Sequence, residues 1–176
     1  MFKSTNKGKK VIVVSNFHED NSISRSNLVF KYFTDRNFDT IVLYSNFSHS
    51  LRAYRYFDNE KFISLSTIGY QSSLSINRIL SHFIYSLQVF KYLIKSEANI
   101  IYVILPPNWL TLTVLFKLTK RIKIIVDVLD LWPEAFPHDN IVTKLILSIV
   151  GVLPRLIRGI AIKNSDYCIT PNDYFF

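Results

Sequence analysis

The sequence predicts an α/β protein with a Rossmann-like, doubly wound parallel sheet, and three observations lead to this fold class. Apolar runs of strand length alternate with stretches that follow the helical period of 3.6 residues. No internal repeat or low-complexity segment interrupts this alternation. The chain has 176 residues, of which 49% are hydrophobic and 19% are charged. This suffices for one buried core and is too short for two ordinary domains, so residues 1–176 are expected to form a single domain.

Six apolar runs predict the strands of the sheet. Because strands and helical patterns alternate along the chain, the strands are expected to lie parallel and to be joined by right-handed crossovers. In chain order, the predicted strands cover residues 11–15, 40–45, 62–66, 99–105, 122–128 and 167–170.

The first two predicted helices follow the first and third strands. Asn21 or Ser22 is expected to cap the first helix, which runs to about Arg36. The second helix covers residues 73–95 and is the most secure, because its apolar residues recur at helical spacing. These apolar residues are Ile76, Ile79, Leu80, Phe83, Ile84, Leu87 and Ile94.

Two more helices are expected in the second half of the chain. Pro107 opens one of them, which runs to about Lys120, since proline suits the first turn of a helix. A long helix follows the fifth strand. Gly151 and Pro154 are expected to kink or break this long helix near its middle.

The corner after the fifth strand, residues 130–134, has the sequence DLWPE. In open parallel sheets, ligands bind beyond the carboxyl ends of the strands, so two carboxylates and an indole at this place indicate a site. Pro133 gives the corner a defined shape, because it fixes its own φ and restricts the residue before it. Two interpretations of Asp130 carry equal weight: it belongs to the site, or it caps the turn or the next helix. Asp127, inside the strand, is expected to be a hydrogen-bonded structural residue.

The other two side chains of the corner also have two interpretations. Trp132 stacks on a ligand or, more in keeping with an indole beside a proline, packs in the core. Glu134 contacts the substrate or, with more weight, a helix N-terminus.

Polar residues follow two other strands at the same predicted edge. His18, Glu19 and Asp20 come after the first strand, but no second His or Cys follows at ligand spacing, so no metal site is predicted. They are expected to form a solvated loop near the site, with Arg25 as a contact for a phosphate or another part of the ligand. After the fourth strand, residues 106–109 (PPNW) form a wall of the cleft or simply start a helix.

The formal net charge of +8 predicts an anionic partner. No acidic residue occurs from 140 to 165, and Lys144, Arg155 and Arg158 share one narrow stripe of an otherwise apolar helix. Such a helix suits an anionic membrane surface, although a core helix with one wet edge explains the pattern nearly as well. No nucleic-acid partner is expected, because no binding motif occurs and the aromatic residues are not interleaved with the basic clusters.

The cellular compartment is predicted from three features. The lone Cys168 excludes an internal disulfide and suits a reducing cytoplasm. The apolar run near the amino terminus breaks too early to be a signal peptide. No segment offers roughly 20 apolar residues free of charge, so a transmembrane helix is not expected.

Four segments together resemble the amino-terminal, acceptor-side domain of a GT-B glycosyltransferase of the family 4 type. They are SNFHEDNSISRS after the first strand, YVILPPNW, VDVLDLWPE and SDYCITPNDYF. The resemblance spans nearly the whole chain, and the DLWPE corner resembles the bacterial surface-polysaccharide branch in particular.

This resemblance implies a function and a set of site residues. The reaction would transfer a sugar, with retention, from a nucleotide-sugar to a lipid-linked or saccharide acceptor at the inner face of the cytoplasmic membrane, with no cofactor and no obligatory metal. Asp130 would be the catalytic residue that orients or deprotonates the acceptor hydroxyl. The substrate-binding residues that the resemblance implies are His18, Asn21, Arg25, Asn108, Trp132 and Glu134.

The sequence departs from this family in two respects. Residues 17–22 lack the glycine-rich turn that often follows the first strand. The sequence ends at Phe176, where the family continues into the domain that holds the nucleotide-sugar. We therefore expect half an enzyme, inactive unless a separate donor domain joins it. The alternative is a noncatalytic membrane-surface docking module, or a truncated remnant, that partners a donor domain.

Overall fold

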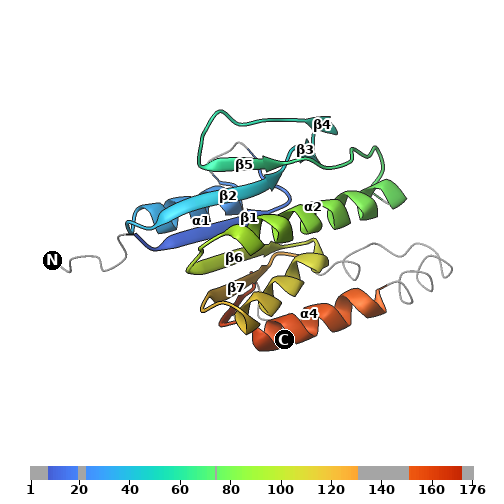
Figure 1. Cartoon of the computed structure of the whole chain (residues 1–176). Coiled ribbons are helices and arrows are strands. Elements are labelled where there is room, and N and C mark those ends of the chain that lie inside the picture. The colour runs from blue at the N-terminus through green and yellow to red at the C-terminus, as the bar shows by residue number, and fades with distance from the viewer. Residues whose placement is uncertain (1–7, 20–22, 74, 131–150, 172–176) are drawn as a thin grey trace.

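The computed structural model describes residues 8–19, 23–73, 75–130 and 151–171. Six strands form one parallel sheet in the order β5-β2-β1-β6-β7-β8 (Figure 1). In chain order these are strands 3-2-1-4-5-6, the arrangement of doubly wound dinucleotide-binding folds, so the predicted fold class is confirmed. The strands are β1 (Lys10–Ser15), β2 (Asp39–Ser45), β5 (Phe62–Leu65), β6 (Ile100–Leu105), β7 (Lys123–Val128) and β8 (Tyr167–Ile169).

Helices cover both faces of this sheet (Figure 1). On one face, α1 (Arg25–Thr34) packs on β1, β2 and β6 through Val29 and Phe33. On the other face lie α2 (Ile76–Lys95), the 3₁₀ helix η1 (Asn108–Leu118) and α4 (Val152–Asn164). Successive residues of β1 alternate between the two cores, because side chains along a strand point to opposite faces.

The first helix starts later and ends earlier than the sequence predicted. Ser24 is its N-cap, with an extended backbone and a side-chain oxygen that accepts a hydrogen bond from the Asn27 N–H at 3.4 Å. The cap was expected at Asn21 or Ser22, which lie outside the described residues, and the end was expected near Arg36. The structure ends α1 at Thr34.

The second helix is confirmed, but its buried face is not its most apolar one. Ser75 caps α2, and the residues that it buries include Tyr85, Val89 and Leu93. The Tyr85 hydroxyl donates a hydrogen bond of 2.8 Å to the Leu43 carbonyl, which ties the helix to β2. The apolar stripe that predicted the helix lies mostly outside: Ile76, Ile79, Leu80, Phe83, Leu87 and Ile94 are exposed.

Two connections differ from the expected alternation of strands and helices. Between β2 and β5 the chain forms a short antiparallel pair, β3 (Phe47–Ser48) and β4 (Ala53–Tyr54), instead of a helix. After β6, residues 108–118 form a 3₁₀ helix rather than the α-helix expected from Pro107 to Lys120. The first difference matters for the site, because the β3–β4 loop brings polar side chains to the carboxyl edge of the sheet.

The last helix starts at Val152, with Gly151 at its N-cap, and is continuous to Asn164. Pro154 is therefore the third residue of α4, where it lacks an N–H that the first turn would leave unpaired. The predicted kink or break near Gly151 concerns a helix whose first half lies outside the described residues, and α4 itself runs through Pro154 without a break. Within the described ranges, no helix combines the length and the apolar character that crossing a membrane requires.

Candidate functional site

A cleft of about 550 Å³ lies at the carboxyl ends of β1, β6 and β7. The chain leaves β1 toward α1 on one face of the sheet and leaves β6 toward η1 on the other, so β1 and β6 flank the topological switch point. Ligands bind at this point in open α/β sheets. The cleft is lined by Ser15, Phe17, Glu19, Ile23, Ser24, Arg25, His49, Arg78, Ile104, Leu105, Pro106, Leu129 and Asp130.

The structure brings some of the predicted site residues to this cleft. Asp130 and Arg25 both line the cleft, and Asp130 is exposed. Pro106 forms part of its wall, as the first residue of the PPNW segment. Asn108 is buried at the first position of η1 and is not among the lining residues. Asn21, Trp132, Glu134 and Lys144 lie outside the described residues.

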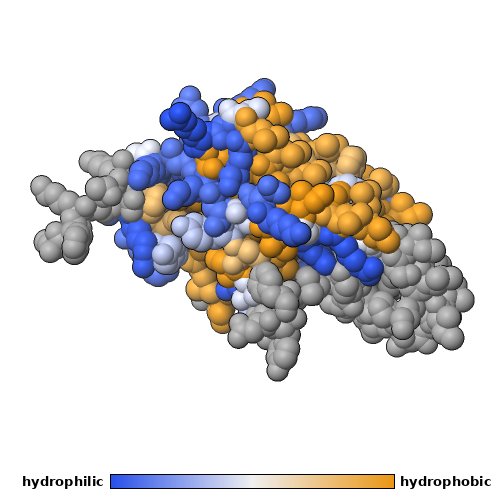
Figure 2. Space-filling model, turned by 90° about the horizontal axis from the view of Figure 1, so that it is seen from below, coloured by the Kyte–Doolittle hydropathy of each residue, from blue (hydrophilic) through white to orange (hydrophobic). Residues whose placement is uncertain are grey.

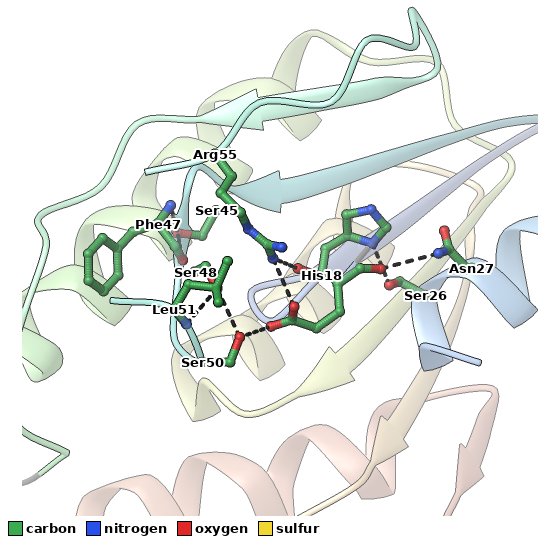
Figure 3. A network of polar contacts seen from close by, with 10 residues as sticks. His18, Ser26, Asn27, Ser45, Phe47, Ser48, Ser50, Leu51 and Arg55 are labelled. Atoms are coloured by element: carbon green, nitrogen blue, oxygen red, sulfur yellow. Dashed lines mark hydrogen bonds and ion pairs between the residues drawn. The ribbon is translucent and has the colours of Figure 1, made fainter. Parts of the chain in front are cut away.

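His18 does not belong to a solvated loop, which corrects the expectation from the sequence. Its side chain is 5% exposed, and its Nδ1 lies 2.7 Å from the Ser26 Oγ (Figure 3). The imidazole packs against the rings of Tyr44, Phe57 and Phe62, with centroids 4.6–5.4 Å apart. The polarity of the His18–Glu19 pair suggested exposure, but the aromatic residues around it come from distant segments. Their packing decides its burial.

The neighbouring Glu19 is held in a network of hydrogen bonds (Figure 3). Its carboxylate accepts from Arg55 Nη2 at 2.9 Å and from Ser50 Oγ at 2.8 Å. Asn27 Nδ2 donates to its backbone carbonyl at 3.2 Å. Because Arg55 neutralises it, Glu19 adds little net negative charge to the cleft that it lines.

Arg25 pairs with a carboxylate of the protein. Its Nε lies 2.9 Å from Asp127 Oδ2, and its Nη2 donates to Oδ1 at 3.3 Å. Asp127 is fully buried and also accepts a 2.6 Å hydrogen bond from the Tyr102 hydroxyl. Burial raises the pKa of Asp127, against the opposing effects of Tyr102 and Arg25. The predicted structural role of Asp127 agrees with these contacts, and the positive charge of Arg25 is largely committed to it.

A second group of basic side chains, of which His49 and Arg78 line the cleft, was missed from the sequence. We call His49, Arg52 and Arg78 the basic cluster. Arg52 Nη1 lies 3.1 Å from His49 Nδ1, and Arg52 Nη2 donates to Ser73 Oγ at 2.9 Å. Arg78 Nη1 donates to the Ser73 carbonyl at 2.9 Å. Residues from the β3–β4 loop and from the first turn of α2 thus meet around Ser73.

One signal in the sequence pointed to this cluster. Arg78 lies in the first turn of α2, which contains no acidic residue. The N-terminus of a helix carries partial positive charge, so a cation there is unfavourable unless something else requires it. No comparable signal marks Arg52, because the fold of the β3–β4 loop decides where it points.

His82 lies behind the basic cluster. It is 7% exposed, and its ring packs edge-on against Phe17 at 5.6 Å and Tyr70 at 6.4 Å between centroids. Burial, together with the charge of Arg78, lowers the pKa of His82 to about 3. His82 is therefore neutral near pH 7, and its Nε2 is buried with no hydrogen-bond partner in the described structure.

Of the three basic residues predicted to face a membrane, Arg158 does not face outward, and Lys144 lies outside the described residues. Arg158 is 8% exposed and lies on the buried face of α4 with Pro154 and Ala161, because these positions recur every three or four residues. Arg155 is half-buried. The outward face is apolar instead, since Val152, Leu153, Leu156 and Ile160 are 50–60% exposed. The exposed face of α4 is therefore apolar, and the basic residue Arg158 lies on its buried face.

Among the residues that the structure describes, no group of three or more His, Cys, Asp or Glu side chains is placed to hold a metal ion. The free Cys168 is half-buried in β8, and burial raises the pKa of its thiol. A raised pKa keeps the thiol protonated and unreactive.

Comparisons with known proteins leave the family open. No family model matches the chain, and no curated protein sequence matches it. Among solved structures, the chain is similar to VPA0982, a protein of unknown function from Vibrio parahaemolyticus. The two chains are 12% identical, the match covers 98% of each, and the TM-score is 0.47. A similarity of this size bears on neither family nor function.

Proposed function

We propose that this chain is the acceptor-binding half of a retaining glycosyltransferase of surface-polysaccharide synthesis, which takes a lipid-linked saccharide as its acceptor. The proposal rests on the resemblance of the four segments quoted above and on one structural observation, the cleft at the topological switch point. A nucleotide-sugar donor would be held by a second domain, so turnover would require that domain as a partner.

The cleft suits part of a saccharide in size and in lining. Ligand sites commonly measure about 300 to 1,000 Å³, and this cleft has about 550 Å³. Its wall combines apolar side chains such as Phe17 and Ile104 with polar ones such as Asp130 and His49. A sugar has the same two characters, because its ring carries apolar C–H faces between hydroxyl groups. In this proposal, the exposed Asp130 carboxylate accepts a hydrogen bond from the reacting hydroxyl of the acceptor.

Nuclear magnetic resonance of the ¹⁵N-labelled chain tests this binding directly. Free saccharides and short-chain prenyl-diphosphate sugars would be titrated in parallel. The expected result is a saturable shift of amide signals around Asp130, Phe17 and Ile104. Shifts confined to other surfaces, or none with any saccharide at millimolar concentration, would contradict the proposal. Asp130→Asn should weaken saccharide binding, whereas Asp39→Asn at the opposite edge of the sheet should leave it unchanged.

A second candidate, a membrane-surface docking module, is favoured by the exposed apolar residues. Figure 2 shows a broad hydrophobic area on the side where α4 lies. Leu153, Leu156 and Ile160 of α4 and Leu115 and Leu118 of η1 are exposed, and α4 packs against η1. In this proposal, apolar contact supplies most of the attachment at the inner face of the cytoplasmic membrane, and the net charge of +8 adds a preference for anionic lipid.

Vesicle sedimentation separates apolar from electrostatic attachment. Changing Leu153, Leu156 and Ile160 together to Ser should abolish binding to anionic vesicles, because it removes the apolar face. Changing Arg155 to Gln should have a small effect. If the Ser variant sediments like the parent, α4 is not the docking face. Binding that ignores lipid charge would remove the role of net charge.

A further inference from the structure

The basic cluster of His49, Arg52 and Arg78 has no carboxylate partner. Four ion pairs occur among the described residues, and they use Arg25, Arg55, Lys61 and Lys117. Arg52 and Arg78 are both half-buried. Guanidinium groups that lose water without gaining a counter-charge are costly, and two of them around one serine add their mutual repulsion.

The hydrogen bonds of the cluster leave His49 neutral, with one donor to spare. Its Nδ1 is close to Arg52 Nη1 at 3.1 Å and to the Tyr70 hydroxyl at 2.9 Å. A guanidinium can only donate, so Nδ1 accepts and the proton of the ring lies on Nε2. Burial lowers the pKa of His49, and the charges of Arg78 and Arg52 lower it further, which agrees with a neutral ring. His49 therefore offers an N–H donor beside two cations.

The surroundings reinforce the positive potential instead of cancelling it. Arg78 lies in the first turn of α2, where the 20-residue helix contributes partial positive charge of its own. The Nε atom of Arg78 is buried and has no hydrogen-bond partner in the described structure. Asp130 acts on Arg78 through space but forms no ion pair with it. Glu19, the other carboxylate of the cleft, is neutralised by Arg55.

Arg52 is also held in an unusual backbone conformation. Its φ is 54°, in the left-handed region that residues with a side chain seldom adopt. Such a conformation costs roughly 1 kcal/mol and persists only where other contacts over-determine it. Here the contacts to Ser73 and to His49, which lines the cleft, hold the guanidinium in place.

We propose that the basic cluster binds a phosphate or diphosphate group of the ligand that occupies the cleft. Two guanidinium groups, the N–H of His49 and a helix N-terminus together match the charge and the many acceptor oxygens of such a group. The inference deepens the proposed function, on which it rests for the rest of the ligand. The diphosphate could belong to a lipid-linked acceptor or to a nucleotide, and the cluster recognises what the two share.

Calorimetric titration with inorganic pyrophosphate at constant ionic strength tests the cluster. The parent chain, Arg52→Gln, Arg78→Gln and the control Arg121→Gln would be compared. Arg121 is exposed and precedes β7, so the control makes the same charge change at the opposite edge of the sheet. Each cluster variant should bind pyrophosphate about 10- to 100-fold more weakly, as expected for a lost charge-assisted hydrogen bond. The control should bind like the parent.

Two results would overturn the inference. Equal affinity of the parent and both cluster variants would show that the arginines do not bind the anion. An equal loss in Arg121→Gln would show that only net charge matters. Thermal unfolding of each variant guards against misfolding, and Arg52→Lys, which keeps the charge but not the paired donors, should bind with intermediate affinity.

Titrations with further ligands identify the source of the phosphate and separate this inference from the proposed function. A short-chain prenyl diphosphate that binds more tightly than a nucleoside diphosphate indicates the lipid-linked acceptor, and the reverse order indicates a nucleotide. Arginine-dependent pyrophosphate binding without any saccharide binding would uphold the cluster and contradict the acceptor proposal. Saccharide binding without pyrophosphate binding would do the opposite.

Discussion

Two arginine sites meet the same cleft, one through Arg25 and the other through Arg78, and they differ in one respect, the presence of a carboxylate. Arg25 lies 2.9 Å from the fully buried Asp127, which the interior of β7 supplies. Arg52 and Arg78 meet no carboxylate within the described structure, and each donates to Ser73 instead. The first site is complete within the protein, whereas the second leaves positive charge uncompensated. The difference shows that an arginine in a cleft is informative only once its partners are known.

Natural sequences usually satisfy local physical rules, and violations concentrate at functional sites. The Arg25 site follows the rules, because its buried charges are paired and hydrogen-bonded. The basic cluster breaks them with two unpaired cations, one of them at a helix N-terminus and the other with a left-handed backbone. The same substitution, Arg to Gln, should therefore lower mainly the stability at the first site and mainly the affinity for an anion at the second.

The largest effect is expected from Arg25→Gln. It leaves the fully buried Asp127 without its cation, so the free energy of unfolding at pH 7 should fall by about 3 kcal/mol. This is the low end for breaking a buried pair, because the Arg25 side chain is 35% exposed. Urea denaturation measures the change. Adding Asp127→Asn should restore part of the stability, because it removes the buried charge.

The effect of Arg25→Gln on the free energy of unfolding should depend on pH. Since the pKa of Asp127 is raised in the native state, its ionisation disfavours folding, and the cost appears as pH rises through its ordinary pKa of 3.8. Removing Arg25 raises this cost, so Arg25→Gln should approach the parent in stability as pH falls. A loss that is independent of pH would show that Arg25 stabilises by packing and not by charge.

The second-largest effect is expected from His82, whose protonation should lower the free energy of unfolding in acid. Its pKa is about 3 in the native state and 6.5 ordinarily, so the unfolded chain binds the proton more readily. Its contribution to stability is complete above pH 6.5 and is lost as pH falls through 6.5 toward 3. Between pH 7 and pH 5 the loss should be about 2 kcal/mol. Thermal unfolding across this range measures it.

His82→Phe serves as the comparison, because Phe fills the site without titrating. It should flatten the pH dependence of the unfolding temperature between pH 5 and pH 7. The pKa of His49 is also lowered, so its protonation also destabilises the fold as pH falls. Some pH dependence of the unfolding temperature should therefore remain in His82→Phe. An unchanged slope in His82→Phe would contradict the assignment to His82.

At the basic cluster, Arg52→Gln and Arg78→Gln should each change the free energy of unfolding by less than about 1 kcal/mol. Each variant loses one hydrogen bond to Ser73, but it also removes a cation that repels its neighbour. The measurement is urea denaturation without added phosphate. Losses as large as that of Arg25→Gln would mean that the two sites are alike and that the cluster is structural.

The smallest effect on stability is expected from Asp130→Asn. Asp130 is exposed, so the free energy of unfolding should stay within about 0.5 kcal/mol of the parent. Pyrophosphate binding should tighten by about 2- to 5-fold, because the nearby carboxylate no longer opposes the anion at Arg78. Early melting would instead support the alternative in which Asp130 caps the turn or the next helix.

The sequence by itself determined the elements and the edge at which the site lies. Hydrophobic periodicity is local, so the six strands, α1 and α2 could be read from it within a few residues. Asp130 reaches the cleft for an equally local reason, because it follows directly after β7.

Only the tertiary structure decided which faces are buried and which charges meet. The apolar stripe of α2 is exposed while Tyr85, Val89 and Leu93 are buried, because the shape of the sheet selects the packing face. Arg25 pairs with a carboxylate 102 residues away, and Arg52 reaches Ser73 across 21 residues. Partners so far apart leave no periodic pattern in the sequence. His18 is buried for the same reason, since rings from distant segments, such as that of Phe57, exclude water from it.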